Sequence, residues 1–132
     1  MNIERVNPPA VTTPTGYSHV TVVSSARQVH VSGQVALDAA GKIVGKDNLS
    51  AQTEQVYANL VACLAAVGAD LSHVFKVVTY VVNLTPERVA DVRAVRNKYL
   101  GQGPYPAGTM VGVTSLVHPD LLIEIEAIAA LD

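Results

Sequence analysis

Apolar and polar positions repeat with two different periods along the chain, and these periods predict strands and helices. In the segment 50–67, Val56, Leu60, Leu64 and Val67 recur at helical spacing, and a second helix is predicted from residue 85 to about residue 100. A short strand is predicted near residues 3–6, within an otherwise irregular arm. The remaining strands are predicted in runs rich in β-branched residues: 19–23, 28–37, 74–82, 109–116 and 121–131.

Capping residues set the expected helix ends. Ser50 is the expected N-cap of the first helix, and Gly68 is the residue expected just beyond its end. The second helix is expected to begin at Thr85-Pro86-Glu87, which supplies a cap, a proline at the first helical position and an acid in the first turn. Gly101 and Gly103 are expected to end it.

The order of these elements predicts the fold class. The strands 19–23 and 28–37 flank Ser24-Ser25-Ala26-Arg27 and are expected to pair as a β-hairpin, and His118-Pro119-Asp120 is a predicted turn. The order β-β-α-β-α-β-β predicts a single two-layer α+β domain over residues 1–132, with both helices on one sheet face. The other face then needs a cover, for which a second copy of the chain is the simplest candidate.

Composition favours an oligomer and argues against nucleic acid as a partner. Apolar residues make up 49% of the 132 residues and charged residues only 15%, which is low for a small monomer with a large surface. The net charge is −2, there is no basic block and Trp is absent, so neither clustered cations nor a base-stacking platform is present.

The residue types that bind metals or form disulfides are sparse. Cys63 is the single cysteine and is expected in the helical core, and the four histidines have no ligand-like spacing, so no metal or cofactor is predicted. The N-terminal sequence is too polar for a secretory signal, and the longest apolar run, 60–69, is about half a membrane span. A cytoplasmic protein with no membrane partner is therefore predicted.

Four stretches of the sequence resemble one known family. The stretch 106–116, Pro-Ala-Gly-Thr-Met-Val-Gly-Val-Thr-Ser-Leu, followed by 122–129, resembles the signature of the reactive-intermediate deaminase (RidA/YjgF, endoribonuclease L-PSP-like) family. Supporting matches are Gly16-Tyr17-Ser18-His19, the strand 31–35, and 52–68 followed by 76–81. The resemblance implies a chorismate-mutase-like fold and a homotrimer with a central β-barrel. It also implies ligand clefts between subunits and hydrolysis of 2-imino or enamino acids to 2-oxo acids and ammonia.

One position departs from the pattern of the imine-hydrolysing members. Those members carry an arginine after the Pro-Ala of the signature, where a guanidinium holds the substrate carboxylate through two hydrogen bonds. Here the position is Gly108, so the chain resembles the arginine-less subgroups, and the missing clamp argues against the standard imine deaminase activity. Arg93 aligns near the family's site and is a candidate replacement anchor, the alternative being a solvated arginine on a helix surface.

The resemblance also assigns candidate site residues elsewhere. Glu124 matches the glutamate that positions the hydrolytic water, and it shares a strand face with Glu126. An acid in apolar surroundings suits general acid-base work, although both acids have the alternative of structural contacts across a trimer.

Further candidates are expected to line the cleft. Tyr17 matches a cleft tyrosine or an interface residue, and Gly33 matches a close backbone approach to the ligand or a simple β-bulge. Ser32 and Thr109 are weaker hydroxyl candidates, and Tyr105 is a candidate cleft wall.

Two functions follow as alternatives. The first is a hydrolase of small reactive imine or enamine metabolites, in which Glu124 activates water. The second is a non-catalytic, small-molecule-binding trimer that senses or scavenges a metabolite. Glu124 favours the hydrolase, and Gly108 favours the binding protein or an unusual substrate.

Overall fold

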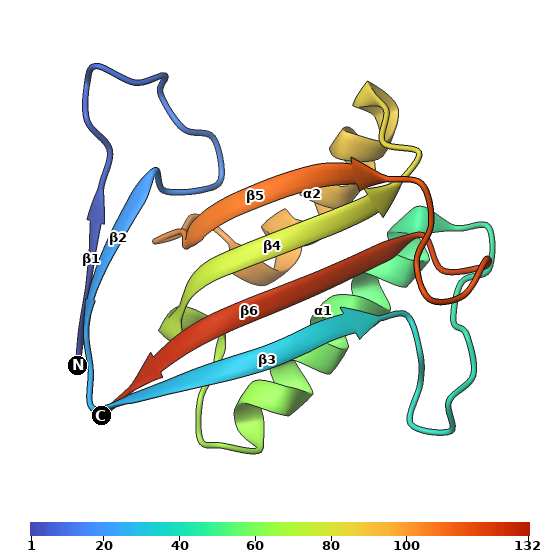
Figure 1. The fold of residues 1–132 in the computed structure, drawn as a ribbon, viewed down its shortest axis with the longest axis horizontal. Coiled ribbons are helices and arrows are strands. Elements are labelled where there is room, and N and C mark those ends of the chain that lie inside the picture. Colours follow the sequence, from blue (N-terminus) through green and yellow to red (C-terminus); the bar gives the residue numbers. More distant parts are fainter.

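Two helices lie side by side on one face of a four-stranded sheet (Figure 1), in a computed structural model that describes residues 1–132. This is the mixed α+β architecture that the order of elements predicts. The elements in chain order are β1 (Asn2–Val6), β2 (Val20–Ser24), β3 (Arg27–Val35), α1 (Leu49–Ala65), a short 3-10 helix (Leu71–His73), β4 (Val74–Val82), α2 (Pro86–Leu100), β5 (Ala107–Val113) and β6 (Ile123–Leu131).

The sheet has the strand order β3-β6-β4-β5. The β6 strand lies antiparallel to both of its neighbours, whereas β4 and β5 are parallel. Parallel strands need a crossover connection, and α2 supplies it by crossing the sheet face between them (Figure 1). The β1 and β2 strands form a separate two-stranded sheet and stand beside one end of the main sheet.

The predicted hairpin between strands 19–23 and 28–37 is wrong. The β2 strand pairs with β1, in a register that places Ile3 opposite Val23, and β3 pairs with β6. Tight hairpins favour Gly or Asn at positions of positive φ, and the connection from Ser24 to Arg27 contains neither. The chain therefore turns away at this point without forming a ladder between β2 and β3.

The helix and strand ends differ from the predicted ones by a few residues. The N-cap of α1 is Asn48 rather than Ser50, and its side-chain oxygen accepts a hydrogen bond from the Ala51 amide at 2.9 Å. That helix ends at Ala65, so Val67 is 47% exposed instead of buried, and Gly68 follows with a φ of +77°. The predicted strand 109–116 is β5 at 107–113, displaced by two residues at its start.

Other predicted boundaries are confirmed. The β4 strand covers 74–82 as expected. The Thr85 side chain caps α2 by accepting from the Arg88 amide at 3.2 Å, and Gly101 ends that helix with a φ of +59°. The amide of Leu121 donates to the carbonyl of His118 at 3.0 Å, which closes the turn before β6.

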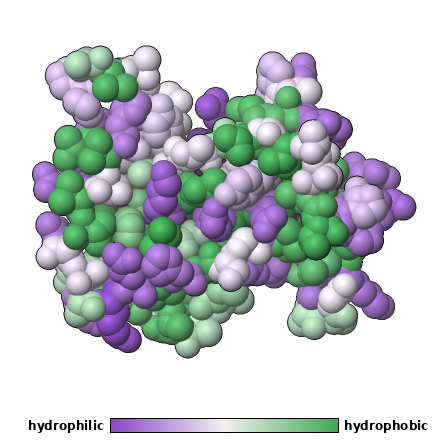
Figure 2. All heavy atoms as spheres, in the orientation of Figure 1, coloured by the Kyte–Doolittle hydropathy of each residue, from purple (hydrophilic) through white to green (hydrophobic).

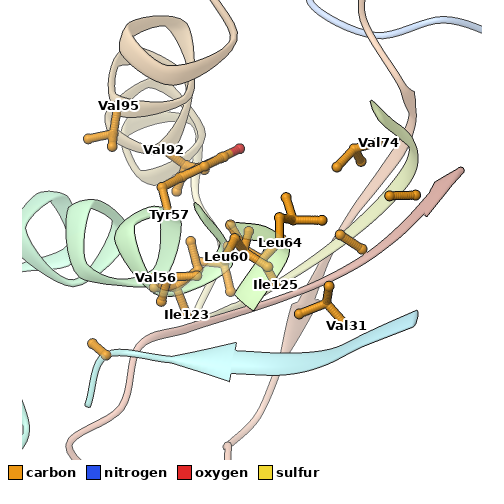
Figure 3. Packing of buried hydrophobic residues seen from close by; sticks show 14 of the residues in the cluster. Val31, Val56, Tyr57, Leu60, Leu64, Val74, Val92, Val95, Ile123 and Ile125 are labelled. Carbon is orange, nitrogen blue, oxygen red and sulfur yellow. The ribbon is translucent and has the colours of Figure 1, made fainter. Parts of the chain in front are cut away.

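The hydrophobic core lies between the helices and the sheet. Val56, Leu60 and Leu64 project from α1 towards the inward side chains of β6, among them Ile123 and Ile125 (Figure 3). These five side chains are 0–1% exposed. Complete burial of such residues contributes roughly 1.5–3 kcal/mol each, so this cluster is the main source of stability.

The opposite face of the sheet is uncovered in the single chain. Along β6, Ile123, Ile125 and Ala127 are buried, whereas Glu124 and Glu126 alternate onto the open face and are partly exposed. Figure 2 shows this side of the molecule, on which apolar and polar atoms are interspersed. The strand β4 likewise has one face buried only in part.

Gln52 is a fully buried polar side chain that joins α1 to the loop before β6. Its amide nitrogen donates to the carbonyls of Asp120 at 2.8 Å and Gly45 at 3.2 Å, and its amide oxygen accepts from the backbone amide of Leu122 at 2.8 Å. One side chain thus satisfies three backbone groups that are distant in sequence.

Replacement of Gln52 by Leu is expected to lower the free energy of unfolding by about 2 kcal/mol or more. The Asp120 carbonyl and the Leu122 amide lose their partner, and each unsatisfied buried group costs about 1–3 kcal/mol, whereas the Gly45 carbonyl keeps its hydrogen bond from the Asn48 amide. Urea unfolding followed by circular dichroism measures the change. The same substitution at the exposed Gln102 should alter stability by less than about 0.5 kcal/mol. Equal effects at the two positions would show that the buried amide is not a stabilising contact.

Candidate functional site

Two hollows lie on opposite sides of the sheet. The first is a cavity of about 300 Å³ at the side of the sheet covered by α2, bordered by β5 and the segment before β2. The second is a hollow of about 220 Å³ on the open face. The sequence-predicted site residues divide between them.

The first cavity is mainly apolar, with cationic and phenolic groups at a few positions. Its wall contains no aspartate or glutamate. The helix α2 and the strands β4 and β5 supply most of the lining. The lining residues are Gly16, Tyr17, Tyr57, Val77, Thr79, Leu84, Val89, Val92, Arg93, Arg96, Leu100, Gly108, Thr109 and Met110.

Arg93 and Arg96 present two positive charges to this cavity. They lie three residues apart on α2, which places them on the same helix face. Neither takes part in any of the chain's ion pairs. Arg93 is exposed, whereas Arg96 is partly buried, and its Nε is buried without a hydrogen-bond partner. Burial lowers the pKa of Arg96, and the positive charge of Arg93 adds to this effect.

Gly16 provides the space in which the Arg96 guanidinium lies. A methyl group on Gly16 would overlap the Nη2 and Cζ atoms of Arg96, and the φ of +76° at this position favours glycine independently. The guanidinium therefore lies directly on the backbone of the segment that precedes β2.

The segment before β2 is held in place by contacts with the Pro-rich loop, residues 103–106 (Gly-Pro-Tyr-Pro). Ser18 donates from its amide to the Pro106 carbonyl at 2.9 Å and from its hydroxyl to the Tyr105 carbonyl at 2.7 Å. Arg5 of β1 donates from Nε to the same Tyr105 carbonyl at 3.2 Å. The N-terminal segment is thus tied to the start of β5, where Gly108 borders the cavity.

Gly108 leaves the cavity open at the position of the signature arginine. A methyl group here would make ordinary contacts of 3.5 Å with Tyr17 Cβ and Val77 Cγ2. The backbone therefore does not require glycine at this position. What the glycine changes is the chemistry of the wall, because no side chain reaches into the cavity from position 108.

The second hollow is lined by Gly33, Tyr80, Leu116, Glu124 and Glu126. The side chain of Glu124 lies directly over Gly33, where any Cβ atom would overlap its carboxylate. Gly33 also sits in a β-bulge, since the register with β6 shifts between Val31 and Gln34. The bulge is therefore present, and the group that lies against Gly33 is the Glu124 carboxylate; the approach of a ligand to Gly33 stays a prediction.

The two acids on this face have different partners. Tyr80 donates its hydroxyl to Glu126 Oε1 at 2.5 Å, and this hydrogen bond raises the pKa of Tyr80. Glu124 is in none of the chain's ion pairs. Its carboxylate is therefore the acid of this face that is free to bind water or ligand.

The structure brings some of the predicted residues together and separates others. Tyr17, Arg93, Gly108 and Thr109 line the first cavity, whereas Gly33 and Glu124 line the second hollow. Two predicted residues line neither: Ser32 is exposed on β3, and Tyr105 lies in the loop that tethers the N-terminal segment.

Sequence reasoning missed Arg96 and Tyr57, which both line the first cavity. The spacing of Arg96 from Arg93 was a usable signal, because residues three apart share a helix face. Tyr57 gave no comparable signal. It is buried in the core, where its ring stacks on that of Tyr99 at a centroid distance of 5.0 Å.

Other kinds of site find little support in the arrangement of side chains. No group of three or more His, Cys, Asp or Glu residues is placed to hold a metal ion. Neither α1 nor α2 has the length and apolar composition that a membrane crossing requires.

The sequence matches one protein family over nearly its whole length. The model of the family described as Endoribonuclease L-PSP matches residues 8–131. A crystal structure of YyfB from Yersinia pestis, a protein of unknown function of the conserved Rid protein family, is similar at a TM-score of 0.93 and 41% identity, over 99% of this chain and all of that one.

Two named proteins are similar to this chain over most of their length. Protein DfrA of Myxococcus xanthus is 35% identical over 113 residues, which are 86% of this chain and 83% of that protein. A 2-iminobutanoate/2-iminopropanoate deaminase of Dermatophagoides farinae is 28% identical over 130 residues, which are 96% of this chain and 95% of the deaminase.

The Tyr57 phenol at the base of the first cavity should make stability depend on alkaline pH. Burial raises the pKa of Tyr57 to about 12 from a usual value of 10.0, against the opposing charge of Arg96. The folded state thus favours the protonated phenol, so its contribution is complete below pH 10 and is lost as the pH rises towards 12.

Between about pH 9 and about pH 11 the wild-type protein should therefore lose on the order of 1 kcal/mol more stability than Tyr57→Phe. Urea unfolding at about pH 9 and about pH 11, followed by circular dichroism because the chain lacks Trp, measures the difference. Parallel losses in the two proteins would mean that the phenol titrates as it does in the unfolded chain.

Proposed function

The chain belongs to the YjgF/RidA (endoribonuclease L-PSP) family, and from this premise we propose that it hydrolyses small reactive imine or enamine metabolites in clefts between the subunits of a homotrimer. The observation that carries the proposal is the unpaired Glu124 carboxylate, which lies over Gly33 in a hollow on the open sheet face. The similarity to an imine deaminase from Dermatophagoides farinae agrees with this chemistry.

In the proposed reaction, Glu124 acts as a general base on water. The carboxylate accepts a proton as the water oxygen attacks the imine carbon, and it returns this proton to the nitrogen to give a tetrahedral carbinolamine. Glu124 then carries the hydroxyl proton to the nitrogen, so that ammonia leaves as the carbonyl forms and the carboxylate is regenerated. One water and one imine thus give one carbonyl compound and one ammonia. A positioned carboxylate contributes typically about 10²–10⁴-fold to such a step.

The separation of the candidate residues supports a site shared between subunits. Within one chain, the first cavity and the Glu124 hollow lie on opposite sides of the sheet, so a small ligand cannot contact both. The open face also carries side chains such as Val111, which is 39% exposed. A trimer that buries this face would cover it and place the Glu124 of one subunit against the first cavity of the next.

A non-catalytic binding role is the second candidate. It is favoured by the first cavity, which combines two arginines and an apolar wall but holds no acid or nucleophile. In this role the trimer would sense or scavenge a small metabolite. A cytoplasmic location and the absence of cofactors, metals and nucleic-acid partners stay predictions from the sequence.

The Glu124→Gln variant should lose at least about 100-fold of the imine-hydrolysis rate while keeping its fold, because an amide cannot accept the proton of the attacking water. The assay generates 2-imino acids in place with an amino-acid oxidase and follows their trapping by semicarbazide. Wild-type protein should lower trapping, and Glu4→Gln on the exposed part of β1 serves as the matched control. Activity that is unchanged in Glu124→Gln would reject Glu124 as the general base, and a wild-type protein that hydrolyses none of the imino acids tried would favour the binding role.

The solution mass should be three times the chain mass of 13.9 kDa, because the proposed site needs residues from neighbouring subunits. Size-exclusion chromatography with light scattering measures it. An arginine at the exposed Val111 of the open face should shift the mass towards that of one chain, since a buried unpaired charge is costly. A wild-type protein that is monomeric at working concentration would remove the shared site.

A further inference from the structure

We infer that Arg96 is the anion anchor of the first cavity, and that the ligand it holds is a small carboxylate with an apolar tail. The inference rests on the proposed function, to whose site it assigns a substrate class. It differs from what the sequence suggested, since it assigns the anchor to Arg96 and not to Arg93. It also places the anchor on α2 instead of at position 108 of β5.

Hydrogen bonding and burial together single out Arg96. Arg93 has no hydrogen bond within the chain, but it is exposed to water. Arg5, Arg27 and Arg88 each donate to a backbone carbonyl. By contrast, the one hydrogen bond of Arg96 runs from Nη2 to the Asn97 amide oxygen at 3.1 Å. Its Nε is buried and has no partner, which is a costly arrangement unless a ligand completes it.

The position of the guanidinium is fixed before any ligand arrives. It lies on the backbone of Gly16, and that segment is tied to the Pro-rich loop through the hydrogen bonds of Ser18. An anchor held in this way loses little conformational freedom on binding. A planar guanidinium is also the cationic group best suited to grip a carboxylate through two parallel hydrogen bonds.

The rest of the cavity defines the remainder of the ligand. Leu84, Val89, Val92 and Met110 give an apolar wall, and a volume of about 300 Å³ lies at the small end of ligand sites. No carboxylate lines the cavity, so none neutralises the charge of Arg96 and none is available to bind an ammonium group of a ligand. The exposed Arg93 on the same helix face adds attraction for an anion without being buried itself. One anionic group and one short aliphatic group therefore complement this surface.

The test uses 4-methyl-2-oxopentanoate, a stable 2-oxo acid with a branched apolar tail, and isothermal titration calorimetry on the full-length protein. Arg96→Gln is expected to weaken binding about 10- to 100-fold, the effect of losing a charged hydrogen-bonding partner. Lys98→Gln removes the same charge from the same helix outside the cavity and should leave affinity unchanged. Arg96→Lys should fall between, because lysine keeps the charge and loses the bidentate geometry.

Two neutral or shortened probes test the ligand class on the wild-type protein alone. The matching ketone 4-methyl-2-pentanone keeps the tail and lacks the carboxylate, and pyruvate keeps the carboxylate and lacks the tail. Both should bind more weakly than the branched oxo acid. Equal binding of the neutral ketone, or equal affinity in wild type and Arg96→Gln, would overturn the inference.

Its failure is distinguishable from failure of the proposed function. Binding of the oxo acid through Arg96 without any Glu124-dependent hydrolysis would support this inference and reject catalysis. Hydrolysis with a KM that Arg96→Gln leaves unchanged would support catalysis and reject Arg96 as the anchor.

Discussion

The buried amide of Gln52 is the contact on which the placement of Glu124 on the open face depends. It joins α1 to Gly45 and to the Asp120–Leu122 segment, so it fixes where the chain enters β6. Side chains alternate along a strand, and a slip of one residue would turn Glu124 into the core and Ile125 out to the open face. The hydrophobic cluster would oppose such a slip energetically, but the Gln52 hydrogen bonds specify the register directly.

The sheet separates two kinds of chemistry. On the helix side, apolar packing leaves a cavity whose polar side-chain groups are guanidinium, phenol and threonine hydroxyl. On the open side, two carboxylates and a tyrosine share a hollow, and one carboxylate already has a short hydrogen bond to that tyrosine. Because anion-binding groups and acid-base groups lie on different faces, one chain holds two half-sites. In an assembly that packs the open face of one chain against the first cavity of its neighbour, the anion-binding groups and the acid would together form a complete site.

Local sequence patterns predicted most of the helices and strands, whereas the pairing of strands that are distant in sequence was predicted less well. The β4 strand and the start of α2 follow from β-branched content and from a cap with proline, which are local signals. The pairing partner of β2 is not set by local sequence. It depends on whether the connection to β3 permits a tight turn, and the actual partner, β1, is separated from β2 by an irregular segment that carries no pairing signal. The grouping of Tyr17, Arg93 and Gly108 came from family resemblance. The helical spacing from Arg93 places Arg96 on the same face, but the burial of its Nε without a partner depends on tertiary packing and is not contained in the sequence pattern.

The contact between Arg96 and Gly16 has a consequence for cooperativity. A ligand that binds the guanidinium changes how firmly the N-terminal segment is held, and by thermodynamic reciprocity a change in that segment alters the ligand's affinity by the same factor. Residues 1–19 also tether the loop at the start of β5 through Arg5 and Ser18. The segment therefore couples ligand occupancy at α2 to the edge of the sheet, and hydrogen exchange in β1 and β2 would report on a ligand that touches neither strand.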